Sequence, residues 1–104
     1  MYESKMKAEE TDRLFEAILS LKSVEECYRF FDDLCTYSEI QAMTQRFQVA
    51  RELYKGNTFS RISGEIGVSS TTITRVNKCL SYGADGYRTV LERLWPKEKE
   101  NRQE

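Results

Sequence analysis

Hydrophobic residues recur along this chain three and four positions apart, which is the spacing of one face of an α-helix. β-branched residues do not alternate with polar residues over any useful length, as they would in strands. The pattern therefore predicts an all-α fold of about six helices. They are expected over about 9–21, 23–35, 37–55, 59–66, 70–80 and 85–95.

Residues at the ends of these segments are typical of helix boundaries. Ser23-x-x-Glu26 and Thr36-x-x-Glu39 both have the form of a capping box, in which two side chains bond free N–H groups of the first turn. Gly56 suits the end of the third helix, because glycine readily adopts the left-handed conformation found there. Pro96 should end the sixth helix, and the charged residues 97–104 are expected to be frayed.

The stretch 59–80 has the spacing of a helix-turn-helix, in which two short helices cross near a right angle. Gly67 falls between the two helices, where a tight turn needs a positive φ. Ser69 or Ser70 should cap the second helix. The residues expected to point inward are Ile62, Ile66, Val68, Ile73, Val76 and Leu80.

The outward face of the second helix carries short hydroxyl side chains and cations but no carboxylate. Such side chains suit the major groove of DNA, where hydroxyls reach base edges and cations bind phosphate or guanine. The helix N-terminus adds N–H groups that can bind a phosphate. Arg61 lies on the preceding helix, which usually crosses the DNA backbone. The expected DNA-binding residues are Arg61, Ser69, Ser70, Thr71, Thr72, Thr74, Arg75 and Lys78.

The distribution of charge supports this interpretation. The net charge is −1, which is unusual for a protein that binds nucleic acid. Residues 1–39 carry ten acidic and five basic residues, a net charge of −5, whereas residues 40–81 carry two acidic and six basic residues, a net charge of +4. The middle of the chain is therefore basic. An ordinary solvated face is the alternative explanation.

Composition argues against several other classes of protein. The 104 residues are the length of a single domain, 1–104. The chain has no histidine and so no Ser-His or Cys-His nucleophile pair. Its five glycines match neither the G-x-G-x-x-G pattern nor the P-loop pattern of nucleotide-binding proteins. No enzymatic activity, metal site or cofactor is therefore expected. Cys27, Cys35 and Cys79 lack a C-x-x-C spacing and are expected to be buried, reduced residues.

The expected location is the cytoplasm, and no membrane partner is expected. No apolar run approaches the roughly 20 residues of a membrane span, and the N-terminus lacks the apolar stretch of a signal peptide. The first two helices nevertheless carry more large apolar residues than a small monomer can cover. A homodimer held by these helices is expected, with contacts from Leu14, Ile18, Phe30, Phe31 and Leu34.

The stretch 35–80 resembles the Trp repressor family, and within it the Trp-repressor-like YerC branch. Thr72-Ile73-Thr74-Arg75 is the most specific part of this resemblance. The other matching residues are Thr36, Glu39, Ala42, Arg46, Glu52, Leu53, Gly56, Ile66, Gly67 and Asn77. The resemblance implies an intertwined homodimer in which the N-terminal helices of both chains form a shared core. It also implies transcriptional repression, with the helix at about 70–80 reading one half of a two-fold symmetric operator.

The resemblance also implies a pocket for an effector, formed by Thr36, Arg46, Arg75, Val76 and Cys79. Trp repressor uses tryptophan as its co-repressor, and the two arginines match those that pack on the indole and bind the carboxylate. Val76 replaces a glycine of the family and Cys79 replaces a serine, and both changes argue against tight tryptophan binding. The alternative is that Val76 turns into the core, as its i+3 spacing from Ile73 permits, and leaves the pocket open. The alternative role of the two arginines is on the surface, facing phosphates or acidic side chains.

The sequence thus favours a sequence-specific, double-stranded-DNA-binding transcriptional regulator, most simply a repressor. The alternative is a helical adaptor or subunit that uses the same hairpin to bind protein without DNA.

Overall fold

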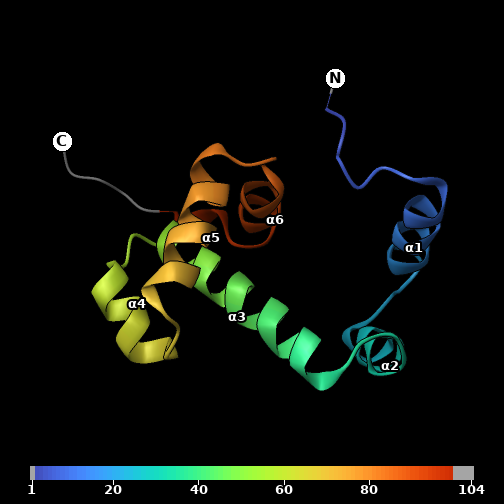
Figure 1. Ribbon diagram of the computed structural model, residues 1–104, viewed down its shortest axis with the longest axis horizontal. Helices are drawn as coiled ribbons and strands as arrows, with labels where there is room; N and C mark the ends of the chain where they lie inside the picture. The colour runs from blue at the N-terminus through green and yellow to red at the C-terminus, as the bar shows by residue number, and fades with distance from the viewer. Residues whose placement is uncertain (1, 100–104) are drawn as a thin grey trace. The chain divides into compact units, whose positions relative to one another are not determined.

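The computed structural model describes residues 2–99, and this part of the chain is all-α, as predicted. Six α-helices are followed by a short 3₁₀ turn (Figure 1), and no strand occurs in the described part. The elements are α1 (Glu9–Leu19), α2 (Val24–Leu34), α3 (Tyr37–Tyr54), α4 (Phe59–Ile66), α5 (Ser70–Tyr82), α6 (Gly86–Leu94) and η1 (Pro96–Glu98). Each helix lies within two residues of its predicted ends.

The helix ends are made as the sequence predicts. At the start of α3, the N–H of Thr36 donates to a Glu39 carboxylate oxygen at 2.7 Å, and the N–H of Glu39 donates to Thr36 Oγ1 at 3.2 Å. The hydrogen bonds that Thr36 donates to the Glu39 carboxylate, above all the one from its backbone N–H, lower the pKa of Glu39. Ser23 Oγ accepts from the N–H of Glu26 at the start of α2. Gly56, with a φ of 95°, ends α3 in the left-handed conformation.

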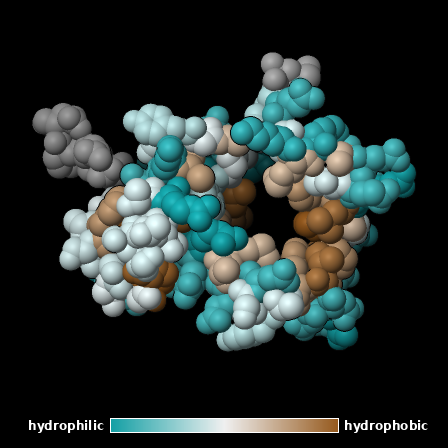
Figure 2. Space-filling view, in the orientation of Figure 1, coloured by the Kyte–Doolittle hydropathy of each residue, from teal (hydrophilic) through white to brown (hydrophobic). Residues whose placement is uncertain are grey.

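The chain folds into two compact units, residues 1–40 and 41–104. No side chain among residues 2–40 is buried. Figure 2 shows hydrophobic residues gathered on the visible face of the unit that holds α1 and α2. Its most exposed large apolar residues within these helices are Phe15, Leu19, Val24, Tyr28 and Leu34. The expectation that 1–104 forms a single domain stays a prediction.

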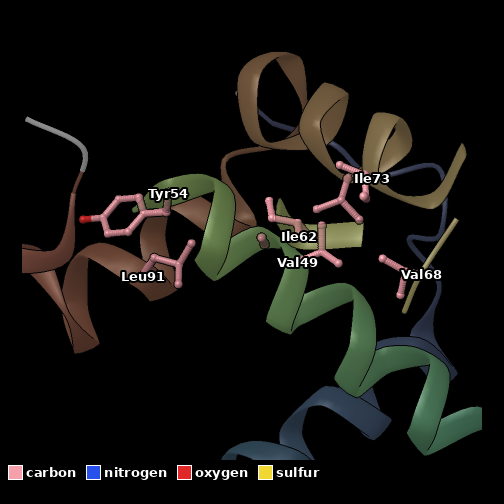
Figure 3. Close-up of a cluster of buried hydrophobic side chains, with 8 residues drawn as sticks. Val49, Tyr54, Ile62, Val68, Ile73 and Leu91 are labelled. Atoms are coloured by element: carbon pink, nitrogen blue, oxygen red, sulfur yellow. The ribbon is translucent and has the colours of Figure 1, made fainter. Parts of the chain in front are cut away.

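The hydrophobic core lies in the second unit (Figure 3). α4 packs on α5, and α5 packs on α6. Ile62 of α4 and Ile73 of α5 are 1% and 0% exposed and point toward one another beside Val49 of α3. The full set of buried residues is Val49, Ala50, Tyr54, Ile62, Val68, Ile73, Val76 and Leu91. This core fixes the relative placement of the two helices of the helix-turn-helix.

The predicted fraying of the C-terminal segment is wrong for residues 97–99. After α6 the chain forms η1, and Glu98 accepts two hydrogen bonds from Arg51 of α3. Arg51 also lies over the ring of Trp95, with its Cζ 3.8 Å from the ring centroid. The remaining part of that prediction, residues 100–104, lies outside the described residues. Within the described part, no helix is both long and apolar enough to cross a membrane.

Candidate nucleic-acid interface

The turn between α4 and α5 is held by its own polar groups. Gly67 ends α4 with a φ of 80°, as the sequence predicts. Ser63 Oγ donates to the carbonyl oxygen of Val68 at 3.0 Å, while the Val68 side chain is only 7% exposed. Ser69, rather than Ser70, is the N-cap of α5, and its Oγ accepts from the N–H of Thr72. These contacts set the direction in which α5 leaves the turn.

The two faces of α5 differ sharply in exposure. Ile73 and Val76 are 0% and 2% exposed and face the core, whereas Arg75 and Lys78 are exposed. Among the predicted DNA-binding residues only Thr72 is half-buried, and all of the others are exposed. The structure therefore brings the predicted residues of α5 other than Thr72 together on one accessible face. Their role in DNA binding stays a prediction.

The cations of this region differ in their partners. Arg61 Nε lies 3.1 Å from Glu65 Oε2, one turn further along α4. No carboxylate among residues 2–99 lies within 4.0 Å of the charged groups of Arg75 or Lys78. The positive charge of α5 is thus available to an anion, whereas that of Arg61 is partly neutralised. The i,i+4 spacing of Arg61 and Glu65 is a sequence signal that could have revealed this pair.

Four of the five predicted effector residues line one pocket of about 280 Å³. They are Arg46, Arg75, Val76 and Cys79. Thr36, the fifth, does not line it and instead caps α3 within the first unit. Sequence reasoning missed Gln45 and Tyr87, which also line the pocket.

Arginine and tyrosine side chains set the electrostatics of this pocket. Burial raises the pKa of the Tyr87 phenol, and the positive charge of Arg46 opposes part of that shift. Tyr87 therefore stays protonated at neutral pH and can donate a hydrogen bond. Cys27 and Cys79 are exposed and Cys35 is only half-buried, so the prediction that the three cysteines are buried is wrong. The pocket offers two cations and a phenol, which suits an acidic ligand.

Comparison with known proteins agrees with this geometry. The model of the Trp repressor protein family matches residues 9–95. The chain is 54% identical over 97 residues to YerC of Bacillus subtilis (strain 168), itself an uncharacterised protein, with 93% of each chain covered.

Two solved structures are also similar. One is a protein from Staphylococcus aureus described as a candidate Trp repressor, 48% identical, with a TM-score of 0.83 over 86% of this chain and 90% of that one. The other is a TrpR-like protein from Eubacterium eligens ATCC 27750, 49% identical, with a TM-score of 0.83 over 86% of this chain and 93% of that one. This chain therefore belongs to the Trp repressor protein family.

Proposed function

We propose that this chain is a sequence-specific, double-stranded-DNA-binding transcriptional repressor that acts in the cytoplasm as a homodimer and has no enzymatic activity. The observation that carries the proposal is the outward face of α5, where Arg75 and Lys78 are exposed and have no carboxylate partner among residues 2–99. Membership of the Trp repressor family supports it.

The polar groups of α5 match what a major groove presents. Thr71 and Thr74 are exposed beside Arg75, so hydroxyls that can reach base edges alternate with a cation that can bind phosphate or guanine. The N-terminus of α5 favours a phosphate through its free N–H groups and its dipole. Arg61 would contact the DNA backbone after exchanging Glu65 for a phosphate.

The homodimer is supported by the first unit. α1 and α2 bury none of their side chains within the described chain, and Leu19 and Tyr28 are 83% and 69% exposed. Large exposed apolar faces usually mark interfaces. A second copy of the same unit would cover these faces and place two copies of α5 on the DNA, as a two-fold symmetric operator requires.

A salt titration of binding to a random-sequence duplex tests the DNA-binding face. Each phosphate contact contributes about 0.9 to the slope of log K against log salt. The double variant Arg75→Ala/Lys78→Ala should therefore weaken binding and flatten the slope by about two units per protomer. The matched control is Arg93→Ala/Lys97→Ala, which removes two exposed cations from α6 and η1 and should leave both quantities nearly unchanged.

Circular dichroism of both variants shows whether the helices are retained. Unchanged binding by a folded Arg75→Ala/Lys78→Ala variant would contradict the assignment of DNA binding to α5. Absence of any salt-dependent binding by the unaltered protein would favour the alternative, a protein-binding adaptor. Sequence specificity is tested by selection from random duplexes, which should enrich a two-fold symmetric site with half-sites about 10 base pairs apart or a multiple of that distance.

A further inference from the structure

A second pocket in residues 41–104, of about 580 Å³, shares no lining residue with the predicted effector pocket. The end of α3, the first residue of α4, the C-terminal half of α5, Arg88 of α6 and Lys99 line it. Its volume lies within the roughly 300–1,000 Å³ of small-molecule sites. Leu53, Phe59 and Leu80 give it an apolar part.

The polar part of this pocket is cationic. Arg88 and Lys99 line it together with Asn77 and Ser81, and no acidic side chain of the described chain does so. Arg88 donates to the carbonyl oxygen of Leu80 at 2.9 Å, which fixes its guanidinium against α5. Its Nε lies 3.9 Å from an exposed carboxylate, Asp85, so its charge is only weakly compensated.

Two acidic side chains near this pocket are paired with cations other than Arg88 and Lys99. Glu98, next to Lys99 in the chain, accepts hydrogen bonds from Arg51. Glu52 does not line the pocket, but it accepts a hydrogen bond from Asn57, which does, and its charge is paired with Lys55. The ion pair of Glu98 also holds the C-terminal segment in place, which brings Lys99 to the pocket. The pocket therefore keeps a positive charge that no side chain lining it neutralises in the described chain.

Tyr54 supplies an independent observation. This residue lines the pocket and is 6% exposed, and its hydroxyl is buried without a hydrogen-bond partner in the described chain. Figure 3 shows the hydroxyl pointing out of the buried cluster rather than toward Ile62 and Ile73. Buried polar groups almost always have a partner, because an unsatisfied one destabilises the fold. An unpaired hydroxyl donor on a residue that lines a cationic pocket is suited to an anionic acceptor.

We propose that this pocket binds a small organic anion, with a carboxylate or phosphate group attached to an apolar body. Its oxygens accept a hydrogen bond from Tyr54 and pair with Arg88 and Lys99, while its apolar body lies against Leu80 and Phe59. The site lies partly on α5, the helix that carries the proposed DNA-binding face.

Titration of the full chain with benzoate and with phenyl phosphate, followed by ¹H–¹⁵N NMR, tests the site without DNA. Its outcome is therefore independent of the proposed function. We expect saturable shifts centred on Asn77, Ser81 and Lys99 with at least one anion, and none with benzyl alcohol at the same concentration. The anion that binds more tightly identifies the acidic group. No saturable shift with either anion, or shifts centred on Arg46 and Arg75, would overturn the proposal.

Three variants make this test specific to the pocket. Tyr54→Phe should weaken binding of the better anion about tenfold, the effect of one hydrogen bond to a charged group. It should not lower the melting temperature of the free protein, because the lost hydroxyl has no partner to leave behind. Lys99→Gln, at an exposed position, should also weaken binding several-fold. Arg93→Gln on α6 is the matched control and should bind the anion as tightly as the unaltered protein does. Equal affinity of Tyr54→Phe and the unaltered protein for the anion would overturn the role of Tyr54.

Discussion

The guanidinium of Arg51 donates two hydrogen bonds, at 2.9 and 2.7 Å, to the carboxylate of Glu98, 47 residues further along the chain. The two side chains are 34% and 28% exposed, so the pair is only partly shielded from water. The hydrogen bonds from Arg51 lower the pKa of Glu98 below its ordinary value of 4.5, with a smaller contribution from the positive charge. This pair joins the C-terminal segment to α3 and makes part of the stability of the protein sensitive to acid.

The stabilisation by Glu98 should be lost in acid. A carboxyl whose pKa is lower in the folded than in the unfolded state contributes stability above its unfolded pKa, and this contribution disappears as the pH falls through the folded value. Glu98→Gln should therefore lower the melting temperature at pH 7 but have progressively less effect below about pH 4. Thermal unfolding of both proteins from pH 7 to pH 3 measures this difference. Glu92→Gln, which removes an exposed carboxylate of α6, is the control; a Glu98→Gln effect that does not change with pH would contradict the prediction.

Ser63 should stabilise the turn of the helix-turn-helix. Its hydroxyl donates to the carbonyl oxygen of Val68 at 3.0 Å. Ser63→Ala leaves this oxygen without that donor and should lower the free energy of unfolding by about 0.5–1.5 kcal/mol, the usual contribution of one hydrogen bond. Urea denaturation measures the change. Ser60→Ala, at an exposed position of the same helix, should change the free energy by less than about 0.5 kcal/mol. Equal effects of the two substitutions would show that the Ser63 bond contributes nothing.

The apolar face of α2 should hold two copies of the chain together. Leu34 is 47% exposed although it lies among the apolar positions of this helix. Leu34→Lys would place a charge in the proposed interface, where an unpaired buried charge is strongly unfavourable. Sedimentation equilibrium should show a dimer for the unaltered protein and a larger monomer fraction for this variant. Asp33→Lys changes a neighbouring position on the polar side of α2 and should leave the dimer intact. A stable monomer of the unaltered protein at micromolar concentration would contradict the homodimer.

The features that sequence predicted best are local ones. The left-handed Gly67, the capping box of Thr36 and Glu39, and the opposite faces of α5 depend on residues within a few positions of each other. Periodicity and end-capping chemistry report such short-range relations directly. The exposed and buried faces of α5 therefore follow from the sequence alone.

Contacts between residues far apart in the chain could not be predicted from the sequence. The pairing of Arg51 with Glu98 depends on how the C-terminal segment returns to α3, and no periodic pattern encodes that path. The same is true of Tyr87, which reaches the predicted effector pocket from α6. Tyr54 has the spacing of an ordinary core residue, and only the structure reveals that its hydroxyl lacks a partner.

Tryptophan should not be a tight ligand of this protein. Val76, where Trp repressor has glycine, lines the pocket with Arg46 and Arg75. Most of its side chain belongs to the buried core, with 2% of its surface exposed, so the part that lines the pocket cannot move aside freely. Overpacking of such a contact costs about 1–3 kcal/mol, or roughly ten- to a hundredfold in affinity. Titration calorimetry with L-tryptophan should show no saturable binding in the low micromolar range.

Because Val76 lies in the core, its replacement by glycine should affect the stability of the protein as well as the pocket. Val76→Gly enlarges the pocket, but it removes a buried side chain and puts glycine inside α5, so it should lower the free energy of unfolding by about 2 kcal/mol or more. Thr74→Gly, on the exposed face of the same helix, puts glycine in the helix without removing a buried side chain. It should lower the free energy of unfolding by less than about 1 kcal/mol. Calorimetry on Val76→Gly is therefore informative only at temperatures where circular dichroism shows it to be folded. If folded Val76→Gly gains tryptophan binding and Thr74→Gly does not, the valine side chain is what prevents binding. Low micromolar binding of tryptophan by the unaltered protein would show that Val76 does not prevent it.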